Sequence, residues 1–109
     1  GARTGGIADS CVYSASKAGL LSITKNFART LGAYGITTNA VLPGGIDTGM
    51  ASRQFERDET LRDHILSASP LGRLGQAAEV ASVVSFLASA DSDYVNGASI
   101  DVNGGWFMA

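Results

Sequence analysis

The chain has 109 residues, of which 45% are hydrophobic and 17% are charged, and its formal net charge is −2. This balance is typical of one packed globular domain and argues against disorder. The eight Lys and Arg residues are scattered, so no basic face for a nucleic acid is expected. No apolar run reaches the roughly 18 residues of a membrane span, and no secretory leader pattern is present. We therefore expect a cytoplasmic protein with no nucleic-acid partner and no membrane partner.

The first predicted element is a long helix from Asp9 or Ser10 to about Leu31, with Ser10 as a capping residue. Cys11 near its start is the one cysteine, expected to be a small buried residue, with a reactive thiol as the alternative. Apolar residues recur along the helix at spacings of three and four, and a second stripe holds small residues. Two buried faces are therefore expected: Leu20, Ile23, Phe27 and Leu31 on one, and Ala15, Ala18, Gly19 and Ser22 on the other.

Two short strands and two further helices are predicted after it. The β-branched run at 36–42 predicts a buried strand, and 98–102 predicts a second one. Helices are expected from Arg53 to Leu66 and from about Ala77 to Ala90. Asn96-Gly97 is compatible with a hairpin turn, but the helical segment before it favours a loop into a parallel strand. The order of elements predicts an α/β fold with parallel strands.

The predicted sheet is too small for its helices. Three amphipathic helices carry more apolar surface than two strands can cover. The sequence also opens at Gly1-Ala2-Arg3 without an initiating methionine. We therefore expect a piece of a longer chain, with more strands upstream of Gly1.

The sequence YSASK places Tyr13 four residues before Lys17, on nearly the same face of the first helix. A free phenol ionises only near pH ~10. An ammonium group about 4 Å away favours the ionised phenol by ~4 kcal/mol at an effective dielectric constant near 20. That upper estimate makes Tyr13 a candidate general acid or base at neutral pH. The alternative is an ordinary surface pair on a helix.

A glycine-rich loop that carries a hydroxyl group follows the first strand, in the run from Asn39 to Thr48. Ligands of open α/β sheets bind beyond the carboxyl ends of the strands, where this loop is expected. Exposed backbone groups from Gly44 to Asp47 and the Thr48 hydroxyl suit an amide such as a nicotinamide carboxamide. The alternative is a plain strand-ending turn.

Four separated motifs resemble the short-chain dehydrogenase/reductase family, and most closely its 3-oxoacyl-acyl-carrier-protein reductase-like members. They are YSASKAGL, ITTNAVLPGGIDTGM, PLGRLGQAAEVASVVSFLAS and YVNGASIDVNGGW. The resemblance implies an α/β fold that is the C-terminal part of a Rossmann-type doubly wound parallel sheet. Residues 1–109 would then be the C-terminal portion of one domain whose N-terminal cofactor-binding half is missing.

The resemblance implies an oxidoreductase that uses NAD or NADP and interconverts a ketone and a secondary alcohol. Tyr13 would exchange a proton with the substrate oxygen, and Lys17 would acidify Tyr13 and bind the nicotinamide ribose. The loop that holds the nicotinamide end would contain Pro43, Gly44, Ile46 and Thr48.

The family's glycine-rich motif and catalytic serine are expected ahead of this sequence. Ser10 is the tempting substitute for that serine, but a capping role is preferred. Met50, Phe55 and Leu61 are substrate-lid candidates by the resemblance, with simple packing as the alternative. The single histidine, His64, is expected on the surface, and no metal site is expected.

The resemblance also implies a homodimer or homotetramer that acts on a small carbonyl or alcohol substrate. Trp106 and Phe107 near the end are candidates for the subunit interface. A sugar or polyol dehydrogenase of the same family is the nearest alternative. A non-catalytic interaction module is the alternative from another class. The 109-residue piece alone is expected to be inactive and poorly stable, because strand edges and helix faces stay uncovered.

Overall fold

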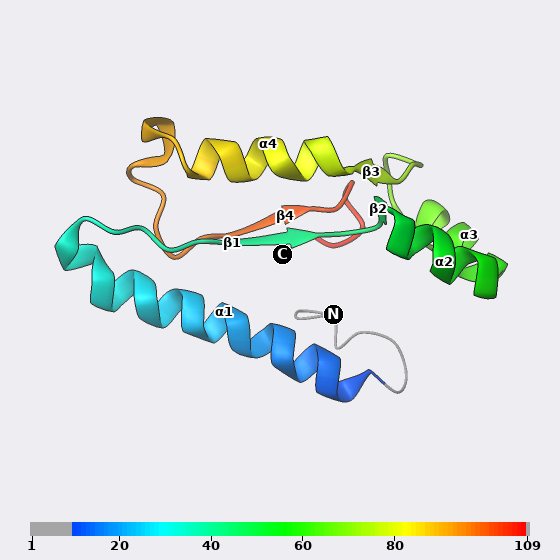
Figure 1. Cartoon of the computed structure of the whole chain (residues 1–109), viewed down its shortest axis with the longest axis horizontal. Coiled ribbons are helices and arrows are strands. Elements are labelled where there is room, and N and C mark those ends of the chain that lie inside the picture. The colour runs from blue at the N-terminus through cyan, green and yellow to red at the C-terminus, as the bar shows by residue number, and fades with distance from the viewer. Residues whose placement is uncertain (1–9, 109) are drawn as a thin grey trace. The chain divides into compact units, whose positions relative to one another are not determined.

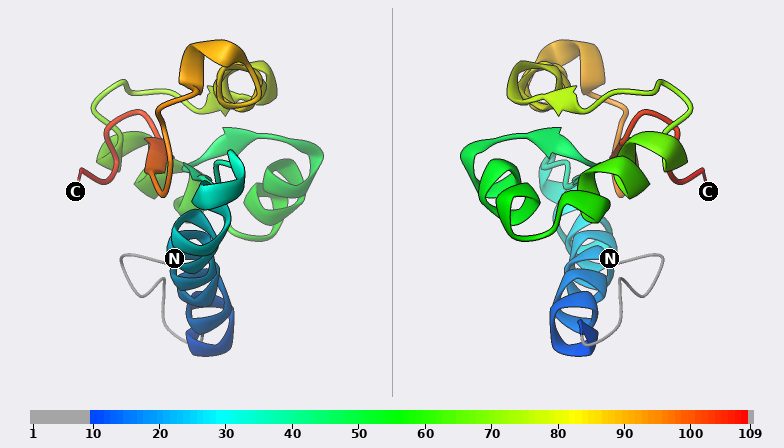
Figure 2. Two further views of the ribbon diagram at one scale, coloured as in Figure 1. Left: turned by 90° about the vertical axis from the view of Figure 1, so that its left-hand side faces the viewer. Right: turned by 90° about the vertical axis from the view of Figure 1, so that its right-hand side faces the viewer.

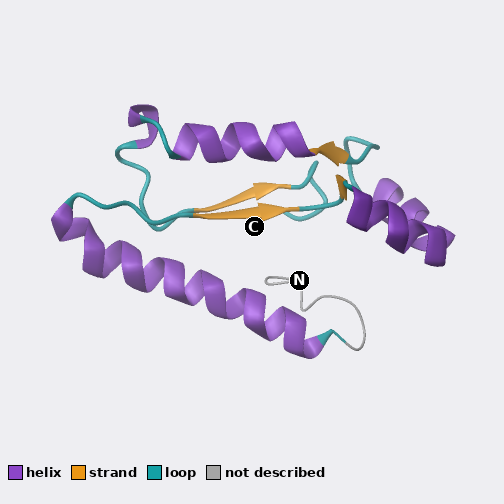
Figure 3. Ribbon diagram, viewed as in Figure 1, coloured by secondary structure: helices purple, strands orange, loops and turns teal. Residues whose placement is uncertain are grey.

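The computed structural model describes residues 10–108, which fall into two compact units. Among the described residues, the first unit contains residues 10–40 together with Ser92–Ser99, and the second contains Val41–Asp91 together with residues 100–108. Figure 1 labels the elements in chain order, and Figure 3 colours them by type. Helices alternate with short strands, as the sequence predicts for an α/β protein.

The main element of the first unit is α1 (Cys11–Leu31), which is one continuous helix in both side views (Figure 2). Ser10 occupies the N-cap position, but its side chain makes no capping hydrogen bond. A short 3₁₀ turn, η1 (Gly32–Tyr34), follows, and Gly35 ends it at φ 74°. The left-handed backbone at Gly35 is the stop that the sequence predicts near this point.

Two burial predictions for α1 are wrong. Cys11 is exposed rather than buried, because it stands in the first turn of the helix, where the described chain packs nothing over it. The buried α1 residues are Ser14, Thr24 and Ala28. Neither predicted face is buried: Leu20, Ile23 and Phe27 are about half exposed, and the small residues Ala15, Ala18, Gly19 and Ser22 are exposed as well. Apolar periodicity marks a face that suits burial, but burial needs a partner, and residues 10–108 provide one only for Ser14, Thr24 and Ala28.

Two asparagine side chains delay the start of the strands in the first unit. The Asn39 amide donates to Val95 O at 2.8 Å and accepts from Ala98 N at 2.9 Å. Asn96 accepts from Thr38 N at 2.9 Å, and its amide donates to Ala28 O at 3.0 Å. These side chains take up backbone groups that a strand ladder would otherwise pair. The predicted strand 36–42 therefore begins only at residue 40.

The two longer strands, β1 (Ala40–Pro43) and β4 (Ser99–Val102), pair with each other. Ala40 N donates to Ala98 O at 2.8 Å, and Gly44 N donates to Val102 O at 3.0 Å. The partners advance together along both strands, so the pairing is parallel, as the two arrows in Figure 3 show. The parallel prediction is confirmed, and the hairpin alternative is wrong. Most of their residues are half-buried rather than fully buried.

In the second unit, the charged segment forms two helices where one was predicted. They are α2 (Gly49–Arg57) and α3 (Glu59–Ala68), and Asp58 separates them in an extended conformation. The Asp58 carboxylate accepts from the Thr60 N–H at 3.1 Å and from the Thr60 hydroxyl at 2.6 Å. These bonds lower the pKa of Asp58, the bond from the Thr60 hydroxyl most. Asp58 acts as a helix cap, which explains why the predicted helix 53–66 is interrupted.

The second unit also contains two short strands that the sequence analysis missed. These are β2 (Ile46–Asp47) and β3 (Gly75–Gln76), which pair in parallel with Ile46 opposite Gly75. The last helix, α4 (Ala77–Leu87), starts where predicted, but it ends three residues early and is followed by the 3₁₀ turn η2 (Ala90–Ser92). Two-residue strands carry no periodic signal, so only their long-range partner defines them.

Candidate functional site

One candidate region is the Tyr13 and Lys17 pair at the start of α1, in the first unit. The Lys17 ammonium lies over the Tyr13 ring, 5.4 Å from its centroid, in a cation–π arrangement. The Tyr13 side chain is 60% exposed, so its phenol is open to a reaction partner. The helix brings the two side chains together as their spacing predicts. In the structure, the Lys17 ammonium contacts the face of the Tyr13 ring. The sequence-based estimate of their interaction energy instead assumed an ammonium about 4 Å from the Tyr13 hydroxyl.

The neighbouring serines have structural contacts on the same helix. The Ser16 hydroxyl donates to the Tyr13 carbonyl at 2.7 Å, and Ser14 is buried. The hydroxyl oxygens of Ser10 and Ser14 are 3.4 Å apart. Ser10 stands at the helix start as predicted, although it does not use its side chain as a cap.

The other candidate region is the loop after β1, which lies entirely in the second unit. Pro43 is exposed, whereas Gly44 and Ile46 are half-buried. A Cβ atom at Gly44 would lie 2.6 Å from Asn103 Cβ and 2.8 Å from Asn103 Cα. Only glycine fits here, because the ends of β1 and β4 approach this closely. The loop therefore lies directly beyond the carboxyl ends of two parallel strands, the position expected of a ligand-binding loop.

Thr48 ends this loop and caps α2. Its hydroxyl oxygen accepts from Ala51 N at 3.2 Å, which leaves the hydroxyl hydrogen available for donation to a ligand. Met50, one of the lid candidates, is 67% exposed on α2, and Phe55 on the same helix is half-buried. The exposed Met50 side chain fits either a lid or a surface position, and the capping role of Thr48 was not predicted.

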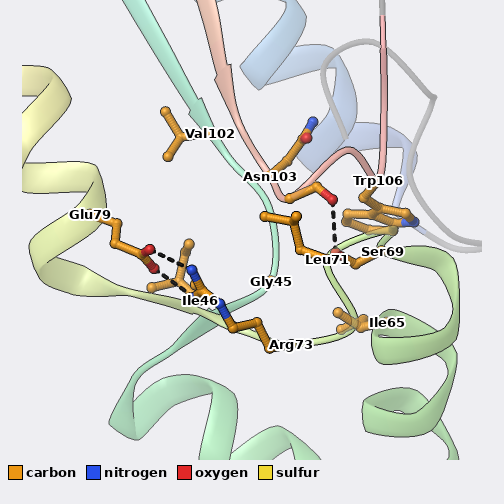
Figure 4. A pocket seen from close by; sticks show the side chains of 12 residues that line it. Gly45, Ile46, Ile65, Ser69, Leu71, Arg73, Glu79, Val102, Asn103 and Trp106 are labelled. Atoms are coloured by element: carbon orange, nitrogen blue, oxygen red, sulfur yellow. Dashed lines mark hydrogen bonds and ion pairs between the residues drawn. The ribbon is translucent and has the colours of Figure 1, made fainter.

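A charged cluster that the sequence analysis missed holds the segment opposite the loop. Arg73 binds both carboxylate oxygens of Glu79, at 2.8 Å and 2.6 Å, as the dashed lines in Figure 4 show. Glu79 also accepts from Gln76 N at 2.8 Å, which completes a capping box on α4. The bond from Arg73, followed by that from Gln76, lowers the pKa of Glu79 to about 2. The spacing Gln76-x-x-Glu79 resembles the capping-box pattern, so it was the available signal.

A small cavity of about 60 Å³ lies beside this cluster in the second unit (Figure 4). Its walls include Ile65, Leu71 and Trp106, and the Ser69 hydroxyl beside it donates to Gly104 O at 3.0 Å. The volume suits one or two water molecules rather than a substrate. Trp106 is 44% exposed, so its predicted role at a subunit interface stays a prediction.

The remaining candidates lie at the surface. His64 is exposed, as predicted, and so are the carboxylates of Glu56, Asp58, Glu59 and Asp63. Within residues 10–108, no three His, Cys, Asp or Glu side chains gather as metal ligands. None of the helices in that same range is both long enough and apolar enough to cross a membrane.

Comparisons with known proteins agree with this architecture. A family model described as enoyl-(acyl carrier protein) reductase matches residues 1–107. The 3-oxoacyl-[acyl-carrier-protein] reductase FabG of Pseudomonas aeruginosa is 52% identical over 97 residues, which are 89% of this chain and 38% of that protein. The chain thus spans about two fifths of the length of this relative.

Two solved structures share the fold. A putative 2-deoxy-d-gluconate 3-dehydrogenase from Agrobacterium tumefaciens, with bound NADP, superposes with a TM-score of 0.88 at 38% identity, over 96% of this chain and 42% of the other. A 3-oxoacyl-[acyl-carrier protein] reductase from Brucella melitensis, with bound NAD, gives 0.79 at 38% identity, over 91% and 34% of the two chains. The fold is therefore that of a Rossmann-type α/β protein, as predicted. The chain belongs to the short-chain dehydrogenase/reductase family, in the group described as enoyl-(acyl carrier protein) reductase.

Proposed function

We propose that this chain is part of an NAD- or NADP-dependent oxidoreductase that interconverts a ketone and a secondary alcohol. The observation that carries the proposal is the accessible Tyr13 phenol with the Lys17 ammonium over its ring, in a chain of this family. In the proposed protein, residues 1–109 form the C-terminal portion of one Rossmann-type domain. The match to about two fifths of the Pseudomonas relative supports a portion rather than a whole domain.

The available donors suit the nicotinamide end of a dinucleotide. Lys17 carries three N–H donors at an exposed position, which suit the ribose hydroxyls. The Thr48 hydroxyl hydrogen is free to donate to a carboxamide oxygen, since the oxygen accepts from Ala51 N. Pro43, Gly44 and the Ile46 backbone complete the proposed loop. A bound nicotinamide supplies or accepts the hydride.

Proton transfer is the task of Tyr13 in this proposal. During ketone reduction, the Tyr13 hydroxyl donates its proton to the carbonyl oxygen, which becomes the alcohol oxygen. During alcohol oxidation, the same oxygen takes the proton back. Lys17 places a positive charge beside the aromatic ring of this proton-transfer group. The serine that polarises the substrate carbonyl is proposed to lie outside this sequence.

A 3-oxoacyl thioester is the favoured substrate class, and a sugar acid is the second candidate. The 52% identity to the Pseudomonas reductase favours the thioester. The Agrobacterium structure, whose name is that of a gluconate dehydrogenase, keeps the sugar alternative open at 38% identity. Met50 and Phe55 on α2 are the proposed substrate contacts, with packing as the alternative role.

The proposed protein works as a homodimer or homotetramer in the cytoplasm. The half-exposed apolar stripe of α1 supports association, since such faces tend to be covered in an assembly. Sedimentation of the full-length protein and fractionation of its cells test these two points.

The full-length protein that contains this chain provides the test. Reduced nicotinamide dinucleotides should bind with a change in their fluorescence, and a 3-oxoacyl thioester should then cause their oxidation. A 3-keto sugar acid serves as the competing substrate, and faster oxidation with it would move the substrate assignment to the second class. Absence of any dinucleotide binding would contradict the proposal and favour the non-catalytic interaction module.

A further inference from the structure

The two end residues of the segment from Arg73 to Glu79 bind each other through their side chains. The Arg73 guanidinium and the Glu79 carboxylate form two charge-assisted hydrogen bonds, and β3 lies between them. We infer that Arg73 and Glu79 are positioning residues for the proposed nicotinamide loop, because their ion pair holds β3 in the place where β3 fixes β2. This inference rests on the proposed function.

The ion pair is tied to the backbone on both sides. Arg73 also donates to its neighbour's carbonyl, Leu74 O, at 3.0 Å. Glu79 also accepts from Gln76 N at 2.8 Å. The two side chains therefore fix the backbone at both ends of β3, at residues 74 and 76. A bidentate guanidinium–carboxylate pair has a defined geometry, which a single contact between flexible side chains lacks.

The strand β3 is paired with β2, so the ion pair that holds β3 also restricts the position of the loop. Gly75 N donates to Gly45 O at 2.9 Å, and Asp47 stands opposite Gln76 in the parallel register. Thr48 is the next residue in the chain after Asp47. Gln76, which the Glu79 carboxylate holds, is thus the direct partner of the residue before the proposed carboxamide donor.

The pairing is also close-packed at Gly75. A Cβ atom there would lie 2.8 Å from Ile46 Cδ1, so the Ile46 side chain occupies the space that a side chain at Gly75 would need. Figure 4 shows Ile46 beside the Arg73–Glu79 pair at the edge of the small cavity. A shift of β3 therefore displaces Ile46 or breaks the contact, and a shift of Ile46 moves the loop.

A plain capping role predicts something different. If Glu79 served only the N-terminus of α4, its loss would lower stability and leave cofactor affinity unchanged at temperatures where the protein is folded. The positioning role predicts weaker cofactor binding with little effect on turnover once the cofactor is saturating. The two roles therefore separate in a comparison of the cofactor Kd with kcat.

The experiment uses the full-length protein and titrates reduced nicotinamide dinucleotide into four variants. They are Arg73→Gln, Glu79→Gln, the double variant, and the control Glu59→Gln. Glu59 is an exposed carboxylate in the first turn of α3, so it matches Glu79 in charge and helix position. Arg73→Lys is added because it keeps the charge and loses the two-pronged geometry, so it covers the case in which Glu79→Gln does not fold.

We expect each single variant to raise the cofactor Kd about fivefold and the double variant to raise it by the same factor, because both partners act through one interaction. The kcat at saturating cofactor should stay within about twofold of the wild type, and Arg73→Lys should fall between wild type and Arg73→Gln. If Glu79→Gln had the same cofactor Kd as the control Glu59→Gln, this inference would be overturned, and the proposed function would stand. If Glu79→Gln does not fold, the same comparison is made with Arg73→Lys. Absence of cofactor binding by the wild type would overturn the proposed function and this inference with it.

Discussion

The two candidate regions, one in each unit, are built in different ways. Tyr13 and Lys17 are four residues apart on α1, and helix geometry alone brings the ammonium over the ring. The loop from Pro43 to Thr48 is instead shaped by residues far along the chain. Asn103 packs against Gly44, and Gly75 binds the Gly45 carbonyl. The Tyr13–Lys17 contact forms whenever α1 is helical, whereas the loop conformation depends on packing against Asn103 and Gly75.

Substitutions in the two regions should therefore affect different properties of the protein. Substitutions in the local pair should change chemistry and leave the fold intact, since both side chains are exposed. Substitutions at the crowded glycines of the loop should change stability first.

Apart from substitution of Tyr13 itself, the largest effect is expected for Lys17→Met in the full-length protein. Loss of the ammonium removes a proposed ribose contact and the positive charge beside Tyr13. Turnover should fall by about 100-fold, the scale of one general acid–base contribution. Lys25→Met on the same helix, another exposed lysine, is the control. Equal rates and equal cofactor affinities in the two variants would contradict the role of Lys17.

The next effect concerns stability at the loop. Gly44→Ala places a Cβ atom 2.6 Å from Asn103 Cβ and 2.8 Å from Asn103 Cα, so the backbone must move. We expect the free energy of unfolding to fall by about 2 kcal/mol, as for overpacked sites. Gly49→Ala is the matched control, since the nearest atom to its Cβ is the flexible Arg53 Nη1 at 3.7 Å. Chemical denaturation of the full-length protein measures both, and equal midpoints would show that the strand ends are not closely packed.

A smaller effect of opposite sign is expected in the helix. A Cβ atom at Gly19 meets nothing within 4 Å among the described residues. Gly19→Ala should therefore stabilise α1 by about 0.5–1 kcal/mol through helix propensity. Thermal unfolding of the full-length protein measures the change. A loss of stability would instead show that another surface packs on the small-residue stripe, as the predicted buried face requires.

The smallest effect is a pH dependence from Glu79. Its pKa is lowered from 4.5 to about 2, chiefly by the Arg73 guanidinium. The pair therefore stabilises the folded state above pH 4.5, and this contribution is lost as the pH falls from 4.5 toward 2. The unfolding midpoints of wild type and Glu79→Gln should converge over that range, with Glu59→Gln as the control. A difference that stays constant down to pH 2 would contradict the pairing.

The sequence predicted those features that depend on neighbours a few residues apart. The end of α1 at Leu31 and the start of α4 at Ala77 follow from periodicity and from local stop and start signals. The Tyr13–Lys17 contact follows from helix geometry. The parallel pairing of β1 with β4 could also be predicted, because a helical crossover separates the two strands.

The sequence did not predict the features that depend on distant partners. The strand β2 exists only because residues almost 30 positions away pair with it. The strand β1 starts late because the Asn39 and Asn96 side chains take the place of ladder bonds. The break at Asp58 could have been predicted, since aspartate is a preferred residue at the start of a helix. It was missed because the whole charged segment 53–66 was interpreted as one helix.

The central claim is that Tyr13 moves the proton, and the most direct measurement compares turnover with cofactor binding in Tyr13→Phe of the full-length protein. Tyr34→Phe, an exposed tyrosine in the first unit, is the control. The account predicts that Tyr13→Phe loses at least about 100-fold in kcat while its cofactor Kd stays within about twofold. Turnover by Tyr13→Phe at the rate of Tyr34→Phe would contradict it.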